Sequence, residues 1–237
     1  INNDDTATVA INDVSVVEGN SGTTNAVFTV TLTGEVQDGF DLGYSSTDGS
    51  ATAPTDYVAV AGGSSINFTG ANGQTRTISV VVNGDTLVEP NETFNVQLGA
   101  ASMAGVSASD GTGVGTITND DAATIAINNV SVVEGNSGTV NLVFNVTLTG
   151  EVQGGFTVQA ATAPVTATAG VDYTTTSTML TFAGTNGEVE TVSVPVIGDV
   201  EDEIDEFFVV NLSALSSASV TISAGTGVGT IIDDDPN

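Results

Sequence analysis

The chain has 237 residues, of which 29 are acidic and only Arg76 is basic, so its formal net charge is −28 with no histidine. A surface this negative repels nucleic acid and anionic lipid, and we expect neither as a partner. Because Cys, His and Lys are all absent, the sequence excludes thiol nucleophiles, Ser-His-Asp triads, zinc sites, disulfides and lysine isopeptide crosslinks. The oxygen donors that remain suit hard cations.

Alternation of apolar and polar residues predicts seven short strands in the first half of the chain, as in Ala26, Phe28, Val30 and Leu32. In chain order the strands span about 8–17, 24–33, 39–47, 63–69, 74–82, 92–99 and 112–118, and Gly-rich turns separate them. No segment has sustained helical periodicity, and none approaches the roughly 18 apolar residues of a membrane helix. The pattern predicts an all-β, immunoglobulin-like antiparallel sandwich, although the Trp and Cys pair of an antibody domain are absent.

The second half of the chain repeats the first. Residues 14–23 recur letter for letter as 130–139, and residues 30–37 recur as 146–153. A period near 115 residues matches a whole small domain, so we expect two tandem sandwiches, 6–121 and 122–235, joined head to tail. An Ile-x-x-Asp-Asp signature begins at Ile1, Ile117 and Ile231, and we expect the array to continue in both directions.

Strand order predicts that the acidic residues gather at one end of each sandwich. If successive strands alternate in direction, the loops after the first, third and fifth strands share a pole with the end of the seventh. Most carboxylates of each copy fall at that pole. Two carboxylates about 5 Å apart repel by roughly 3 kcal/mol at an effective dielectric near 20, and a hard divalent cation removes this cost. Ca²⁺, which takes six to eight oxygens, fits better than Mg²⁺.

Two other interpretations of the acidic residues fit the sequence less well. A solvated, halophile-like surface would spread its charge evenly, whereas this charge is concentrated. An EF-hand is excluded because the acidic stretch 199–206 lacks the Gly and the spacing of that loop.

Four motifs, each present twice and in order, resemble the Calx-beta family, whose calcium-binding modules occur in sodium–calcium exchangers and in bacterial surface proteins. They are Val-Val-Glu-Gly, an Asp-Tyr pair, an acidic loop that ends in Glu-x-Phe, and a closing acidic triplet. In this sequence they lie at Val16–Gly19 and Val132–Gly135, Asp56–Tyr57 and Asp172–Tyr173, Glu92–Phe94 and Glu206–Phe208, and Asn119–Asp121 and Asp233–Asp235.

The resemblance implies a set of calcium ligands in each copy. In the first copy these are Glu18, Asp56, Asp85, Glu89, Glu92, Asn119, Asp120 and Asp121, with Leu87 contributing its backbone carbonyl. In the second they are Glu134, Asp172, Asp199, Glu203, Glu206, Asp233, Asp234 and Asp235, with Glu201 contributing its carbonyl. Calcium-rich members open the acidic loop with an Asp pair, where this chain has Gly84-Asp85 and Gly198-Asp199. We therefore expect two or three ions per domain. The second copy should bind them better, because its acidic loop carries more charge.

The repeat organisation suggests a mechanical role for the calcium. Only a short link near Ala122-Ala123 joins the copies, so ions held by the first copy would fix the interdomain angle. We expect a non-enzymatic, calcium-rigidified spacer in a secreted or cell-surface bacterial adhesin, with neighbouring repeats and a cell-surface or glycan ligand as partners. The alternatives are a calcium-sensing regulatory module of a transporter and a calcium-dependent carbohydrate or cell adhesion module. Paired carboxylates also catalyse glycoside hydrolysis. Aromatic residues make up only 5% of the chain, however, and the acidic pole lacks the aromatic side chains on which a bound sugar would stack, so we do not expect a glycosidase.

Overall fold

The computed structural model describes residues 6–236, and every regular element in that range is a β-strand. The Ile1–Asp5 signature lies outside the described residues. The described chain divides into two compact units, which comprise residues 6–86 with 90–120 and residues 87–89 with 121–236. The described residues contain no candidate membrane-spanning helix. The all-β fold predicted from the alternating pattern is confirmed.

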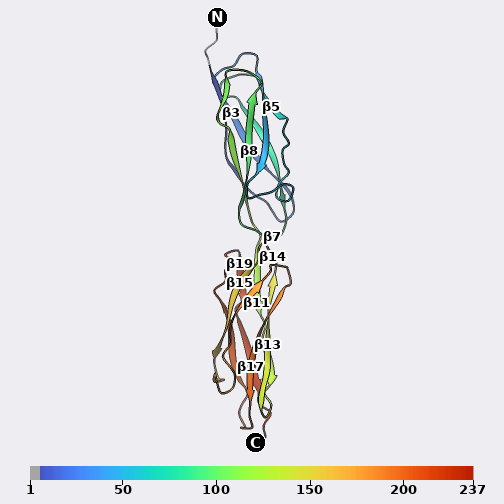
Figure 1. Cartoon of the computed structure of the whole chain (residues 1–237), viewed down its shortest axis with the longest axis vertical. Coiled ribbons are helices and arrows are strands. Elements are labelled where there is room, and N and C mark those ends of the chain that lie inside the picture. The colour runs from blue at the N-terminus through green and yellow to red at the C-terminus, as the bar shows by residue number, and fades with distance from the viewer. Residues whose placement is uncertain (1–5, 237) are drawn as a thin grey trace. The chain divides into compact units, whose positions relative to one another are not determined.

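Each unit contains two facing sheets (Figure 1). In the first unit the sheets have the orders β6-β3-β1-β9 and β2-β10-β8-β4-β5. These strands are β1 (Ala7–Ile11), β2 (Val14–Val17), β3 (Gly22–Thr33), β4 (Phe40–Asp48), β5 (Ser64–Phe68), β6 (Thr75–Gly84), β8 (Glu92–Ala101), β9 (Val106–Asp110) and β10 (Thr112–Thr118).

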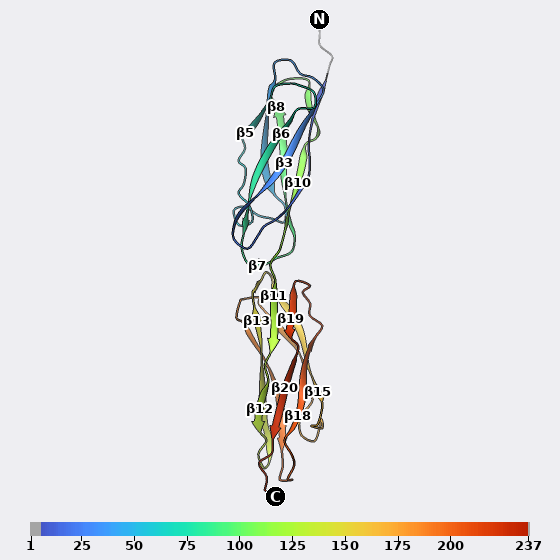
Figure 2. The same cartoon turned by 180° about the vertical axis from the view of Figure 1, so that it is seen from behind.

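The second unit repeats this arrangement with the orders β17-β13-β11-β19 and β12-β20-β18-β15-β16 (Figure 2). A separate two-stranded sheet pairs β14 with β7. The strands are β7 (Leu87–Val88), β11 (Ala123–Ile127), β12 (Val130–Val133), β13 (Gly138–Thr149), β14 (Glu151–Val152), β15 (Phe156–Pro164), β16 (Ser177–Phe182), β17 (Val189–Gly198), β18 (Glu206–Ser213), β19 (Val220–Ala224) and β20 (Thr226–Ile232).

The predicted first strand, 8–17, is in fact two strands that belong to different sheets. The break falls at Asn12 and Asp13, whose side chains accept hydrogen bonds from the backbone N–H groups of Thr29 (2.5 Å) and Val114 (2.7 Å). These bonds satisfy the backbone of both sheets where the chain crosses between them. As a result β2 pairs in parallel with β10, and β1 pairs in parallel with β9, so the sandwich is not wholly antiparallel as expected.

Aromatic stacking in each core fixes the position of two acidic residues. Tyr173 is fully buried and stacks on Phe208, with ring centroids 4.3 Å apart. Asp172 precedes the tyrosine, and Glu206 lies two residues before the phenylalanine, so the stacked pair brings the two carboxylates to the same end of the unit. The Tyr57–Phe94 stack, at 4.5 Å, is its counterpart in the first copy. Burial of such large side chains contributes strongly to stability.

Candidate metal centres

The parallel pairing of β12 with β20 brings together the first acidic cluster of the second unit. Val133 lies opposite Ile232 in this pair, and the N–H of the next residue, Glu134, donates to the Ile232 carbonyl (3.2 Å). Glu134 therefore lies beside the acidic triplet that follows β20. One carboxylate oxygen from each of Glu134, Asp233 and Asp235 lies within 4.8 Å of the others.

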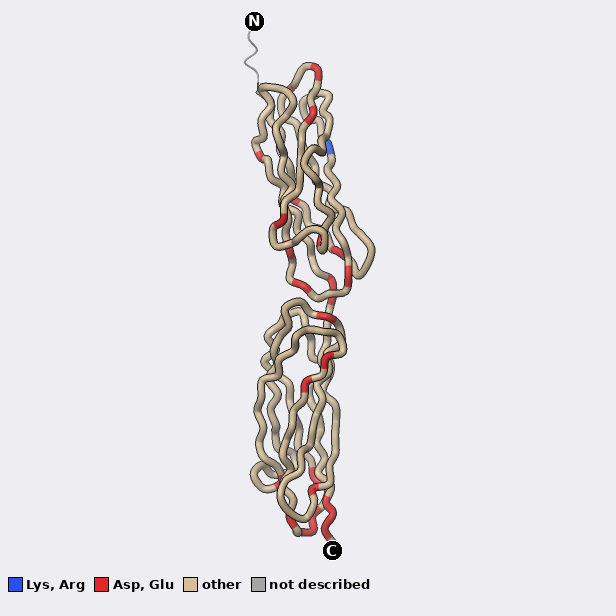
Figure 3. The backbone as a smooth tube through the Cα atoms, turned by 45° about the vertical axis from the view of Figure 1, so that its right-hand side comes forward, with Lys and Arg blue, Asp and Glu red and all other residues tan. Residues whose placement is uncertain are grey.

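The second cluster of this unit combines Asp172 with Glu203 and Glu206, again with one oxygen from each within 4.8 Å. Asp172 is held in place because its Oδ2 accepts the N–H of Thr168 at 2.5 Å. Glu206 begins β18, and Glu203 lies in the acidic loop that precedes it. Figure 3 shows that acidic positions are concentrated at the end of the second unit where the chain terminates.

The pKa values of three of these carboxyl groups are raised, first by burial and then by the neighbouring carboxylates. Burial, followed by the charges of Asp199, Glu203, Asp233 and Asp235, raises the pKa of Glu134 to about 7. Burial and the neighbouring Asp172 and Glu203 raise the pKa of Glu206 to about 7. Burial and several of these charges also raise the pKa of Glu203. Groups from both clusters act on one another, so the two clusters form one electrostatic unit.

The cluster of Glu134, Asp233 and Asp235, called the Glu134 cluster below, also contains carboxylate oxygens that accept no hydrogen bond from residues 6–236. Asp233 Oδ1 and Asp235 Oδ2 are buried and accept no hydrogen bond among the described residues. The other oxygen of Asp235 accepts a hydrogen bond from the Asn136 side-chain amide. The only basic residue of the chain, Arg76, lies in the first unit on β6. Buried, unpaired carboxylate oxygens cost free energy unless a cation neutralises them, and this donor set fits a hard divalent ion.

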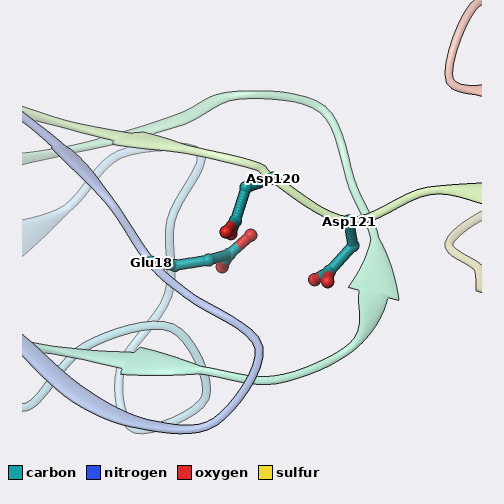
Figure 4. A group of neighbouring side chains, drawn as sticks. All are labelled: Glu18, Asp120 and Asp121. Carbon is teal, nitrogen blue, oxygen red and sulfur yellow. The ribbon is translucent and has the colours of Figure 1, made fainter.

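The first copy of the repeat also forms two carboxylate clusters, but only one of them, Asp56 with Glu89 and Glu92, uses the same repeat positions as the second copy. Glu18, Asp120 and Asp121 form the other, and Figure 4 shows their carboxyl groups turned toward a common space. Asp120 takes part in it, although its counterpart Asp234 lies outside the cluster of Glu134, Asp233 and Asp235. In both copies the middle residue of the closing acidic triplet accepts a hydrogen bond from the glycine of the Val-Val-Glu-Gly motif. Asp120 accepts the N–H of Gly19 (3.0 Å), and Asp234 accepts that of Gly135 (2.9 Å).

Twelve of the eighteen predicted site residues fall in these four clusters, and six do not. The predicted carboxylate ligands outside them are Asp85, Asp199 and Asp234. Leu87 and Glu201, predicted to bind through backbone carbonyls, and the amide residue Asn119 are not carboxylate ligands and stay predictions. Asp199 accepts the N–H of Glu201 (2.8 Å), although its charge still acts on Glu134 and Glu203. The N–H of Asn119 donates to the Asn91 side chain (3.1 Å), and Leu87 lies in β7. Because Asn119 stands where the second copy has Asp233, the closing triplet of the first copy has one carboxylate fewer.

Sequence reasoning missed the residues that position the ligands. Asn136 bonds Asp235, and Asp205 accepts the N–H of Asp233 (3.3 Å). The repeated Gly-Asn-Ser-Gly turn, at 19–22 and 135–138, was the available signal for the former. On sequence alone this pattern predicts only a turn between strands.

The fold and site define a tandem β-sandwich protein that gathers carboxylates at loop ends. The Calx-beta domain model matches the sequence twice, over residues 2–121 and 118–235, and the chain therefore belongs to the Calx-beta family. The oxygen-rich clusters are consistent with Ca²⁺ as the cofactor of this family. The narrower predicted boundaries, 6–121 and 122–235, stay a prediction.

Several solved structures are similar to the chain at low sequence identity. "CBD12 from CALX1.2" is 19% identical, with 94% of this chain and 99% of that chain covered and a TM-score of 0.43. The "Apo-form Calx CBD1 domain" is 23% identical, with 48% of this chain and 100% of that chain covered and a TM-score of 0.44. No curated protein matches the chain.

Proposed function

We propose that each copy binds Ca²⁺ through its two carboxylate clusters, and that the bound ions stiffen a non-catalytic spacer. The observation that carries the proposal is the Glu134 cluster, where buried carboxylate oxygens without hydrogen-bond partners lie among groups with strongly raised pKa values. Three carboxylates per cluster supply part of the six to eight oxygens that Ca²⁺ takes, and backbone carbonyls and water complete the shell.

The ligand set is the one implied by the family resemblance. The clustered carboxylates of Glu18, Asp56, Glu89, Glu92, Asp120, Asp121, Glu134, Asp172, Glu203, Glu206, Asp233 and Asp235 bind the ions directly. Asp85, Asp199, Asn119 and Asp234 complete the sites, together with the carbonyls of Leu87 and Glu201. Binding is linked to stability, because only the folded sandwich assembles ligands from loops this distant in sequence.

The stiffening role is supported by the place of the ligands in the chain. Strand β10 ends at Thr118 and β11 begins at Ala123, so only four residues connect them. Two of the four are the clustered ligands Asp120 and Asp121. An ion that holds these side chains removes backbone freedom from the connection. We place such a spacer in a secreted or cell-surface protein, where calcium modules bind at about 10⁻⁴–10⁻³ M.

Small-angle scattering tests the stiffening role. We expect the spread of particle dimensions to narrow when millimolar Ca²⁺ replaces EDTA, and the Asp120→Asn/Asp121→Asn variant to lose this response. Identical scattering in the two buffers would refute the stiffening role, but it would not refute the proposed binding of calcium.

A calcium-sensing regulatory module of a transporter fits the family assignment equally well. Affinity separates the two roles. A sensor requires half-saturation near the roughly 10⁻⁷–10⁻⁵ M of intracellular sensors, whereas the spacer requires about 10⁻⁴–10⁻³ M. Glycan-array binding that is abolished by a chelator would instead favour the adhesive module.

A further inference from the structure

The second unit has a strand edge that binds a short extended segment. Strand β7 adds in parallel to β14, with Leu87 opposite Glu151 and Val88 opposite Val152. Val88 is only 3% exposed and belongs to the core of this unit. Gln153 fixes the segment twice, because its backbone N–H donates to the Val88 carbonyl (2.9 Å) and its side-chain amide donates to Glu89 Oε1 (2.7 Å).

The first unit has an equivalent strand edge, with the same sequence and the same local backbone hydrogen bond. Glu35-Val36-Gln37 is identical to Glu151-Val152-Gln153. The Val36 N–H donates to the Gly70 carbonyl (2.8 Å), just as the Val152 N–H donates to Gly184 (2.8 Å). The backbone at the two positions is therefore held alike, and the edge that receives β7 in the second unit is present in the first.

In the first unit this strand edge lines a groove of about 640 Å³. Its lining includes Ala7, Glu35, Val36, Gln37, Met103 and Val106. Val36 and Val106 are half-buried there, whereas their counterparts Val152 and Val220 are 6% and 3% exposed. Gln37 is exposed, and its backbone N–H has no acceptor among residues 6–236. The groove thus offers an apolar floor and a free strand-edge donor.

We propose that this groove of the first unit is a strand-addition site for an extended Leu-Val-Glu segment of another polypeptide. The middle residue enters the floor beside Val36, its carbonyl accepts the Gln37 N–H, and the Glu accepts the Gln37 side-chain amide. Main-chain pairing supplies the binding and the buried side chain supplies the selectivity, as in other edge-strand complexes. The equivalent loop of the second copy reads Glu201-Asp202-Glu203. It is a poor occupant, because it would bury an aspartate at the central position.

Disulfide trapping tests this proposal, since the wild-type chain has no cysteine. The probe is the peptide Asp-Thr-Cys-Val-Glu-Pro-Asn, which is segment 85–91 with Cys in place of Leu. It is incubated with the full chain carrying Glu35→Cys in a glutathione redox buffer. The matched control is Glu151→Cys, an exposed position on the strand that already pairs with β7. We expect at least fivefold more adduct with Glu35→Cys.

A second peptide in which Asp replaces the central Val tests the selectivity and should lose most of the adduct. Equal yields at the two protein positions, or from the two peptides, would overturn the proposal. The unmodified peptide with the wild-type chain gives an independent readout. Amide NMR shifts should move at residues 35–38 and 105–106, and shifts confined to other residues would likewise overturn the proposal. Dimers that form without peptide and fill the groove with a segment other than 87–89 of the second copy would overturn the assigned segment.

Discussion

A Cβ atom on Gly198 would lie 1.9 Å from the carbonyl oxygen of Gly135 and 2.6 Å from that of Glu134. The end of β17 therefore approaches the turn that carries Glu134 more closely than any side chain allows. Gly84 has the same relationship to Gly19 (2.1 Å) and Glu18 (2.7 Å). This contact gives a physical reason for glycine at the two positions where calcium-rich family members are expected to have aspartate.

Substituting Gly198→Ala should displace the Glu134 turn, because the obstructing atoms belong to the backbone and cannot rotate away. We expect a loss of about 1–3 kcal/mol in the free energy of unfolding, together with weaker calcium binding. Chemical denaturation and calorimetry measure the two effects. Gly62→Ala is the control, since its Cβ would meet nothing within 4 Å. A Gly198→Ala protein as stable as this control would refute the close approach.

Substituting Glu134→Gln should have opposite effects with and without metal. In EDTA at pH 7.5 it removes a buried charge that its neighbours disfavour, so the melting temperature should rise. In Ca²⁺ it removes a ligand, so the affinity of the second unit should fall about tenfold or more. Glu188→Gln is the matched control, because the Glu188 carboxylate accepts backbone N–H groups from Ala183, Gly184 and Thr185. It should lower stability in both buffers and leave calcium affinity unchanged. A lower melting temperature of Glu134→Gln in EDTA would count against the electrostatic account.

The metal-free protein should lose stability as pH rises from about 4.5 to 7. The folded-state pKa values of Glu134 and Glu206, both about 7, lie above the ordinary value of 4.5. Folding therefore takes up protons, and the stability they contribute is complete below pH 4.5 and is lost as pH rises through 7. Calcium competes with these protons, so stabilisation by Ca²⁺ should grow over the same range. Thermal melts from pH 4.5 to 8 in EDTA and in Ca²⁺ measure both trends, and the Glu134→Gln/Glu206→Gln variant should flatten them. A metal-free melting temperature that rises with pH would be inconsistent with these shifts.

Much of the fold followed from local patterns, because period-two alternation and an exact internal repeat both survive in the sequence. Glu18 and Asp120 could be placed together, since strand parity decides which loops share an end. The break at Asn12-Asp13 was missed although the apolar phase shifts there, from Ala7, Val9 and Ile11 to Val14 and Val16. Edge strand β9 was missed because it is polar and mostly exposed.

Other features depended on contacts that no single segment reveals. Asp234 resembles its neighbours in sequence, yet its oxygen caps Gly135 while Asp233 and Asp235 join the cluster. Strand β7 has only two residues and forms only because β14 presents an edge to it. Pairing of this kind is set by tertiary structure, and it leaves no periodic signal in the strand itself.

Calorimetric titration of the chelator-treated chain with CaCl₂ tests the central claim most directly. One ion at each carboxylate cluster predicts at least four Ca²⁺ per chain, and saturation at 100 times the dissociation constant should stabilise the fold by about 2.7 kcal/mol per independent site. The Glu134→Gln variant should lose at least one ion. No heat of binding at millimolar Ca²⁺, with a melting temperature that does not respond to the metal, would contradict the account.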